Sequence, residues 1–248
     1  MYKAKFMEVK KMDIGEIISD SIKYPSSNWG KVLILGIITI ASVLIVPVFL
    51  LIGYVFRIIK ATLAGIDELP EFDEIGGMFV DGLKVFVVGI IYSIPVYIIA
   101  LIVGLLMGSG SAASAASLGP GYVLALLLSN LVTFIISLIV GLVAIMAVVN
   151  MAYNDGDLGA AFRFSDLLNV IATIGWGKYI VTYIVIAIVG TVGVFIGVLT
   201  MFLLIGFILL PLIILPYLFM FEARAFALLF ADAVGEVPEV PVEEPLTE

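Results

Sequence analysis

The chain has 248 residues, of which 63% are hydrophobic and 13% are charged, and its formal net charge is −8. A soluble domain is typically about 45–50% apolar and about 25% charged, so this composition indicates a protein that lies in lipid. The chain contains no cysteine and no histidine, which excludes disulfides, thiol nucleophiles, imidazole bases and metal sites built from these residues. The tail from Ala231 onward carries six acidic residues and no base, which leaves the rest near −2, with no basic field for nucleic acid.

The first apolar stretch, Val32–Phe56, allows two interpretations. It is long enough for one tilted span, which needs about 20 apolar residues. Alternatively it turns at Val46–Pro47, and a second arm continues to Gly65. The positive-inside rule favours the turn, because all twelve Lys and Arg residues then lie on or next to one side of the membrane. We therefore expect a hairpin here, with Arg57 inside the membrane.

The remaining apolar stretches predict four more spans. Val85–Met107 and Tyr122–Val149 are two clear helices, separated by the small, uncharged linker Gly108–Gly121. The stretch Tyr179–Phe221 has 43 residues without a charge. As one helix it would be about 65 Å long, roughly twice the thickness of the hydrocarbon core. It therefore predicts a hairpin that turns near Leu199–Gly206.

Three short motifs occur twice in the same order: Ser-Asp, Trp-Gly-Lys and Phe-Leu-Leu-Ile-Gly. They begin at Ser19, Trp29 and Phe49 in the first copy, and at Ser165, Trp176 and Phe202 in the second. Such an order predicts an internal repeat. In the second copy the last motif follows the required turn, so the first copy should follow a turn as well.

An amphipathic segment precedes each expected hairpin, and helices of this kind beside a membrane typically lie flat in its interface. The apolar faces are Ile14, Ile17, Ile18 and Ile22; then Phe72, Ile75, Phe79, Leu83 and Phe86; then Leu158, Ala161, Phe162, Leu168 and Ile171. Asp157 is the expected N-cap of the third segment.

The expected fold is an all-α membrane protein with six transmembrane helices in three hairpins. The hairpins occupy about residues 30–65, 84–150 and 176–224 of a single membrane domain, 1–230. The acidic, proline-rich residues 231–248 should form a disordered tail. Both termini are expected in the cytoplasm of a multi-pass protein of the cell membrane.

The segment GYVFRIIKATLAGIDELPEFDEIGGMFVDGLKVFVVGIIYSIP resembles the integral membrane family called domain of unknown function 4013, found largely in archaea and some bacteria. The matching positions are Gly53, Tyr54, Arg57, Gly65, Leu69, Pro70, Phe72, Asp73, Asp81, Gly82, Lys84, Tyr92 and Pro95. Family members often have Trp where this chain has Phe72. The resemblance implies a polytopic membrane protein and no assigned activity.

Arg57 is the first candidate for a functional residue, because an arginine within a span is costly by about 2.5–3.5 kcal/mol. It would contact a substrate or a lipid headgroup, or else it would have a structural partner or extend to the inner interface. Glu222, near the inner end of the last span, is its expected partner. Asn130, Tyr54 and Tyr92 complete the possible intramembrane polar site.

Small residues at four-residue spacing let helices approach closely. On this basis the expected helix-packing residues are Ser129, Thr133, Ser137, Gly141, Gly193 and Gly197. They would pack within the monomer's own bundle or form a contact between copies.

The acidic residues elsewhere do not form a recognised site. The loop from Asp67 to Asp81 could bind a divalent cation, but it has no EF-hand spacing, and the acids more often cap a helix and keep a turn soluble. Asp155 and Asp157 lie in a cytoplasmic turn, unlike the facing aspartates of an intramembrane protease. We expect no metal site, no cofactor and no catalytic residues.

The sequence leaves two functions open. The first is a non-enzymatic scaffold or subunit of a membrane assembly, in contact with lipid and possible membrane-protein or homo-oligomeric partners. The alternative is a transporter or channel for a small or lipid-like solute, with a water-accessible cavity lined by Arg57, Asn130, Tyr54 or Tyr92.

Overall fold

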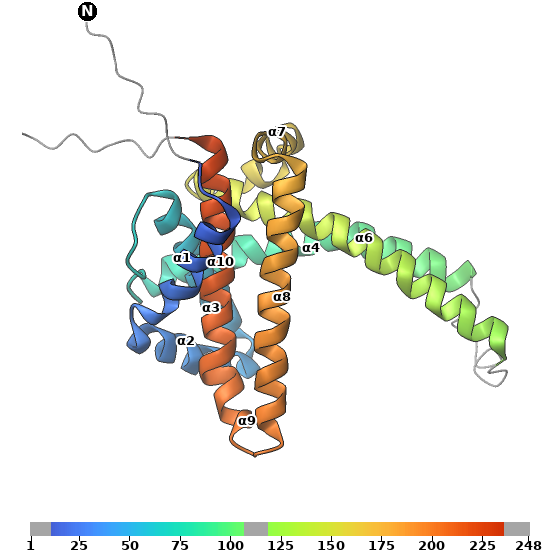
Figure 1. Cartoon of the computed structure of the whole chain (residues 1–248), viewed down its shortest axis with the longest axis horizontal. Helices are drawn as coiled ribbons and strands as arrows, with labels where there is room; N and C mark the ends of the chain where they lie inside the picture. The colour runs from blue at the N-terminus through green and yellow to red at the C-terminus, as the bar shows by residue number, and fades with distance from the viewer. Residues whose placement is uncertain (1–10, 107–118, 236–248) are drawn as a thin grey trace, which may run out of the picture. The chain divides into compact units, whose positions relative to one another are not determined.

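The computed structural model describes residues 11–106 and 119–235, and the regular secondary structure in these ranges is helical (Figure 1). Among the described residues, five segments are long and apolar enough to cross a membrane. A sixth is added if the bent pair Ile14–Ser26 and Trp29–Leu44 counts as one span. The first four are α3 (Val46–Leu63), α4 (Ile75–Leu106), α6 (Pro120–Tyr153) and α8 (Trp176–Met201). The fifth is a continuous run of α9 (Gly206–Leu209), the π-helical turn η3 (Leu210–Ile214) and α10 (Leu215–Val234). The chain is therefore an all-α membrane protein.

The helices form two compact units. The first unit comprises Met1–Gly36, Ile58–Glu71 and Asn169–Glu248, and the second comprises Ile37–Arg57 and Phe72–Leu168. Three helices contribute residues to both units: α2 (Trp29–Ala41), α3 and α7 (Phe164–Ile174).

The first unit begins with the amphipathic helix α1 (Ile14–Ser26). A capping box starts it: the Asp13 side chain accepts from the backbone N–H of Glu16 at 2.8 Å, and the Glu16 side chain accepts from the backbone N–H of Asp13 at 3.0 Å. Ile17 and Tyr24 of α1 are buried, and α1 packs on α10. The predicted amphipathic pattern of this segment is thus used in packing against another helix.

The α8–α10 hairpin of the first unit is held by a glycine face on α8. A Cβ added at Gly193 would lie 2.9 Å from Leu218 Cδ2, and one added at Gly197 would overlap Leu210. Both glycines therefore let α8 approach the second arm of its own hairpin. The chain reverses between Met201 and Gly206, with Leu204 at a positive φ of 60°, which confirms the predicted turn.

In the second unit, the first apolar stretch is broken near the predicted position. A short 3-10 helix, η1 (Ser42–Leu44), follows α2, and Ile45 has a positive φ of 68°. The break directly precedes the turn predicted at Val46–Pro47. Because the 13 residues of α2 extend only about 20 Å, shorter than the roughly 30 Å core, the count of six spans stays a prediction.

Helix α3 crosses the start of α4 at very close range in the second unit. A Cβ added at Gly53 would overlap the carbonyl group of Met78, and one added at Gly82 would overlap that of Phe49. The backbones can approach this closely because both positions lack a side chain. The Phe49 ring also packs edge-on against the ring of Phe79, 5.2 Å away.

The second predicted amphipathic segment is not a separate interfacial helix. Residues 75–86 form the first turns of α4, which continues without a break to Leu106. The prediction was wrong because no helix-ending residue separates this segment from the apolar run that follows. The linker at residues 107–118 lies outside the described residues.

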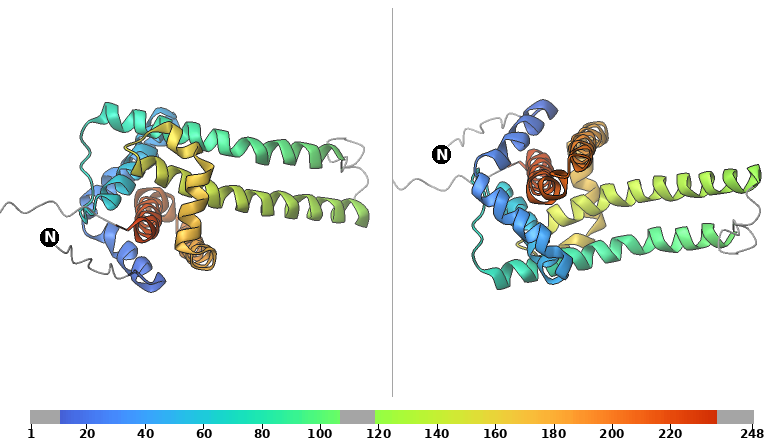
Figure 2. Two further views of the ribbon diagram at one scale, coloured as in Figure 1. Left: turned by 90° about the horizontal axis from the view of Figure 1, so that it is seen from above. Right: turned by 90° about the horizontal axis from the view of Figure 1, so that it is seen from below.

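Helices α4 and α6 run side by side, as both views in Figure 2 show. On α6, Ser129, Thr133 and Gly141 are half-buried and Ser137 is exposed, with its hydroxyl donating to Thr133 O at 2.8 Å. The small residues of α6 thus differ in burial, and they do not form one uniformly buried stripe.

After α6, the chain forms the 3-10 helix η2 (Leu158–Phe162) and then α7. The predicted N-cap is confirmed, because Asp157 accepts from the backbone N–H of Gly159 at 3.0 Å. At the other end of the chain, α10 extends to Val234, past the expected start of the disordered tail at residue 231. Residues 236–248 of that tail lie outside the described residues.

Candidate functional site

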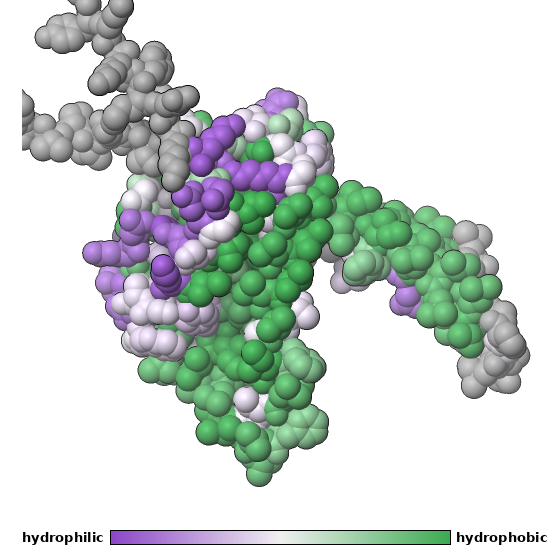
Figure 3. Space-filling view, viewed as in Figure 1, coloured by the Kyte–Doolittle hydropathy of each residue, from purple (hydrophilic) through white to green (hydrophobic). Residues whose placement is uncertain are grey.

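Hydrophilic side chains gather at one end of the first unit. Figure 3 shows them around α1, whereas the lower part of the α8–α10 hairpin is almost entirely hydrophobic. The turn at the hydrophobic end, Phe202–Ile205, has no charge. This separation is typical of a membrane hairpin with one end at a charged interface.

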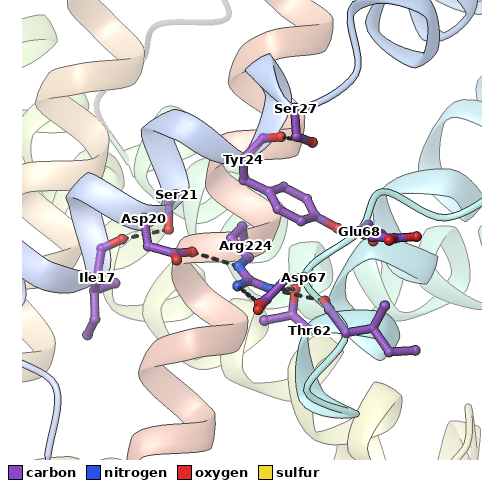
Figure 4. Close-up of polar contacts among 10 residues, drawn as sticks. Ile17, Asp20, Ser21, Tyr24, Ser27, Thr62, Asp67, Glu68 and Arg224 are labelled. Atoms are coloured by element: carbon purple, nitrogen blue, oxygen red, sulfur yellow. Dashed lines mark hydrogen bonds and ion pairs between the residues drawn. The ribbon is translucent and has the colours of Figure 1, made fainter.

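At the charged end lies Arg224 of α10, which is only 4% exposed (Figure 4). Its Nε donates to Asp20 Oδ1 at 2.9 Å, and its Nη2 donates to Asp67 Oδ1 at 2.5 Å. Its Nη1 contacts Ile66 O at 3.2 Å and Thr62 Oγ1 at 3.4 Å. One guanidinium therefore joins α10, α1 and the loop that follows α3, which we call the Arg224 junction.

The ring of Tyr24 completes the Arg224 junction. The Arg224 Cζ lies 4.7 Å from the ring centroid, within the range of a cation–π contact. Burial raises the pKa of the Tyr24 phenol to about 12, so the hydroxyl stays protonated at neutral pH. It donates to Glu68 O at 3.2 Å, which ties α1 a second time to the same loop.

Electrostatically, the junction pairs a buried cation with carboxylates that still reach water. The side chains of Asp20 and Asp67 are 44% and 86% exposed. The desolvation of Arg224 is offset by two charged hydrogen bonds, and neither acid loses all of its hydration. The direct effect of these contacts is to hold three segments together. No bound substrate is needed to account for them.

The lysines of the two Trp-Gly-Lys motifs make similar contacts in the first unit. Lys178 Nζ donates to Asp232 Oδ2 and to Met12 O, both at 2.6 Å. Lys31 Nζ donates to Leu69 O at 2.6 Å and to Glu71 Oε1 at 2.8 Å. Each lysine therefore ties the start of an apolar helix, α2 or α8, to a backbone carbonyl and a carboxylate.

The tryptophans of the same motifs, Trp29 and Trp176, are both about half exposed, at 51% and 49%. The ring of Trp29 lies 6.0 Å from that of Tyr217. Exposed Trp next to a membrane helix is typical of the interfacial belt. These contacts agree with a repeated motif at a membrane boundary, but the internal repeat itself stays a prediction.

In the second unit, Arg57 is bound to the loop before α4. Its Nη1 donates to Asp73 O at 2.7 Å and to Asp73 Oδ1 at 3.0 Å, and its Nη2 donates to Glu74 O at 3.0 Å. Glu74 has a positive φ of 42°, so the guanidinium stabilises a turn of unusual backbone conformation. One helical turn earlier on α3, the Tyr54 ring is stacked on Phe72 with 3.9 Å between centroids.

The other candidates of the second unit lie elsewhere. The Tyr92 hydroxyl donates to Ala161 O at 2.7 Å, and its position on α4 is about 25 Å along the helix from Ile75. The Asn130 side chain is exposed on α6 and donates to Leu126 O of its own helix at 2.8 Å. Within this unit, Tyr54 and Arg57 are brought together, and Tyr92 and Asn130 are not.

Glu222 lies on α10 against Gly190 of α8 in the first unit. A Cβ added at Gly190 would lie 2.8 Å from Glu222 Oε1. Among the described residues, Glu222 has no hydrogen bond and no ion pair. The expected pairing of Arg57 with Glu222 joins the two units and stays a prediction.

Sequence reasoning did not identify Arg224 as a candidate. It lies near the charged end of the last span, where a basic residue is ordinary. Its partner Asp20 is 204 residues away in the chain. The only available signal was its position among apolar residues, in the segment FEARAFALLF, where a cation needs a partner.

The acidic loop also has a structural use. Of its carboxylates, Asp67 binds Arg224, Glu71 binds Lys31 and Asp73 binds Arg57. In the part of the chain that the structure describes, no three acidic residues are placed to hold a metal ion together.

Comparisons with known proteins give one match. A family model described as "Protein of unknown function (DUF4013)" matches residues 34–202. No curated protein and no solved structure matches the chain. The family match covers Arg57 and its loop, but Asp20 and Arg224 lie outside it. Because it spans more than half of the 248 residues, the chain belongs to the DUF4013 family of membrane proteins, whose activity is unassigned.

Proposed function

We propose that this protein is a non-enzymatic scaffold or subunit of a membrane assembly. The observation that carries the proposal is how the polar groups of the spans are used. The side chains of Asn130 and Ser137 bond to carbonyls of their own helix, and Tyr92 bonds to Ala161 O. These polar groups therefore have hydrogen-bond partners within the protein, without a bound solute or a chain of water molecules.

The grooves along the spans support the same proposal. One groove of about 460 Å³ lies between α8 and the second arm of its hairpin, and one of about 390 Å³ lies beside α4 and α6. Within the part of the chain that the structure describes, neither groove is lined by a charged residue. Apolar grooves on membrane helices suit lipid or another helix better than a hydrated solute.

The proposal includes a topology of six spans in three hairpins, with both termini in the cytoplasm of a cell-membrane protein. The basic residues Lys31, Lys178 and Arg224 support this orientation, because they lie at the charged end of the first unit. The uncharged turn at residues 202–205 belongs on the outer side.

Cysteine accessibility tests both the topology and the function, because the natural chain has no cysteine. Single cysteines at Pro47 and Phe202 should react with an impermeant thiol reagent from outside only, and one at Leu69 from inside only. A cysteine at Asn130 should stay protected in a packed, lipid-facing assembly. Reaction at Leu69 from outside would contradict the topology, and rapid reaction at Asn130 would contradict the scaffold.

A transporter for a lipid-like solute is the second candidate, and one observation favours it. The groove of about 390 Å³ in the second unit has an aromatic wall, in which the ring of Tyr92 is stacked 5.9 Å from that of Phe162. A water-soluble reagent that reaches a cysteine at Asn130 would favour this candidate over the scaffold.

A further inference from the structure

We propose that Glu222 is the docking point for a lysine or arginine in a transmembrane helix of a partner subunit, and that this helix lies in the apolar groove between α8 and α10. The inference rests on the proposed function, since a scaffold or subunit needs a partner. It deepens that function by stating which surface is used and which chemistry the partner carries.

The first observation is the state of the carboxylate. Glu222 is half-buried on α10 and faces Gly190 of α8, and no described residue donates to it or pairs with it. Two residues further on, Arg224 is held by two carboxylates. A carboxylate in apolar surroundings is costly unless it has a partner, so its retention indicates one.

The second observation is the space around Glu222. Gly190 and Gly193 lie one turn apart on α8, and they face Glu222 and Leu218, which lie one turn apart on α10. Gly193 and Leu218 line the groove of about 460 Å³. Glu222 is therefore one helical turn, about 6 Å, beyond the end of a groove that a helix could occupy.

The third observation is the lining of the groove, which decides the kind of occupant. It is formed by aliphatic side chains of α8, η3 and α10 and by Tyr217, with no charge. An apolar helix fits this lining, and a single cation on that helix would complement Glu222. The occupant is thus an apolar helix with one basic residue.

The fourth observation distinguishes a different subunit from a second copy of this chain. In the described spans, Arg57, Lys84, Lys178 and Arg224 already donate to the protein's own carbonyls or carboxylates. Lys60 has an interaction of its own as well. A second copy would therefore have to break existing contacts to supply the cation.

The test uses two synthetic single-span peptides of leucine and alanine in phosphatidylcholine vesicles. They are identical except that one has lysine and the other glutamine at the seventeenth position from the outer end, because Glu222 lies sixteen residues after Gly206. Binding is measured by energy transfer from a dye on a cysteine at Phe202, which is exposed in the outer turn, to a dye on the outer end of the peptide.

The lysine peptide should bind the native chain about tenfold more tightly than the glutamine peptide, and Glu222→Gln should remove this difference. Val192→Trp, which fills the groove, should weaken both peptides. Asp155→Asn changes an acid outside the groove and should have no effect. Equal affinities of the two peptides for the native chain, or an unchanged preference in Glu222→Gln, would overturn the proposal.

The thermal stability of the chain in micelles tests the competing partner. Because no described residue pairs with Glu222, Glu222→Gln should leave the midpoint unchanged or raise it. If Glu222→Gln and Arg57→Gln instead lower the midpoint equally, and the double variant lowers it no further, the two residues pair and the proposal is wrong. Protection of a cysteine at Asn130 tests the scaffold separately, so either idea can fail alone.

Discussion

The two arginines within apolar helices, Arg57 and Arg224, solve the same problem in different ways. Arg57 of the second unit binds the loop that follows its own helix, at Asp73 and Glu74, only 16 and 17 residues away. Arg224 of the first unit joins segments that are 157 and 204 residues away. The first contact fixes a local turn, whereas the second fixes how distant segments pack.

This difference predicts unequal costs when each guanidinium is removed. Arg224 is the more buried cation, and its carboxylates come from two separate segments. Arg57 makes two contacts with backbone carbonyls of a single loop. The loss of Arg224 should therefore affect the whole first unit, and the loss of Arg57 should affect one connection in the second.

Arg224→Gln is the variant with the largest expected effect. Removing one partner of a buried ion pair costs about 3–5 kcal/mol, and the exposure of Asp67 places the expected loss near the lower limit. Unfolding in mixed detergent micelles measures it. Arg224→Lys keeps the charge but not the fork of donors, and it should lose less. A loss below about 1 kcal/mol in Arg224→Gln would mean that the junction holds little.

The contrast between local and distant contacts also explains what the sequence could predict. The turn at residues 202–205 was predictable because 43 uncharged residues cannot form one span. The Asp157 cap was predictable because it depends on residues only two positions apart. Both features are local consequences of length and spacing.

The Arg224 junction was not predictable in this way. Nothing in residues 19–24 specifies that α1 packs on α10, because its amphipathic pattern fits an interface or another helix equally well. The continuity of α4 was also missed, since an amphipathic start and an apolar continuation can belong to one helix. In both cases the outcome depends on packing partners that periodicity does not name.

Arg57→Gln should have an intermediate effect. Losing charged hydrogen bonds to two backbone carbonyls costs about 2 kcal/mol. The loss should be local, so hydrogen exchange should rise in the loop before α4 more than in the α8–α10 hairpin. A loss equal to that of Arg224→Gln, spread over the whole protein, would contradict the comparison between a local and a distant contact.

The smallest effects are expected for the exposed acids of the same loop, in Glu71→Gln and Asp73→Asn. Their basic partners, Lys31 and Arg57, are nearly equal in side-chain exposure at 13% and 14%, but the two acids are 74% and 71% exposed. Each base also keeps a backbone carbonyl as acceptor, Leu69 O for Lys31 and Asp73 O for Arg57. Each substitution should therefore cost less than about 1 kcal/mol in the same unfolding assay. If either one costs as much as Arg57→Gln, the carboxylate rather than the carbonyl holds the base, and local backbone contacts do not differ from distant ion pairs in the way proposed.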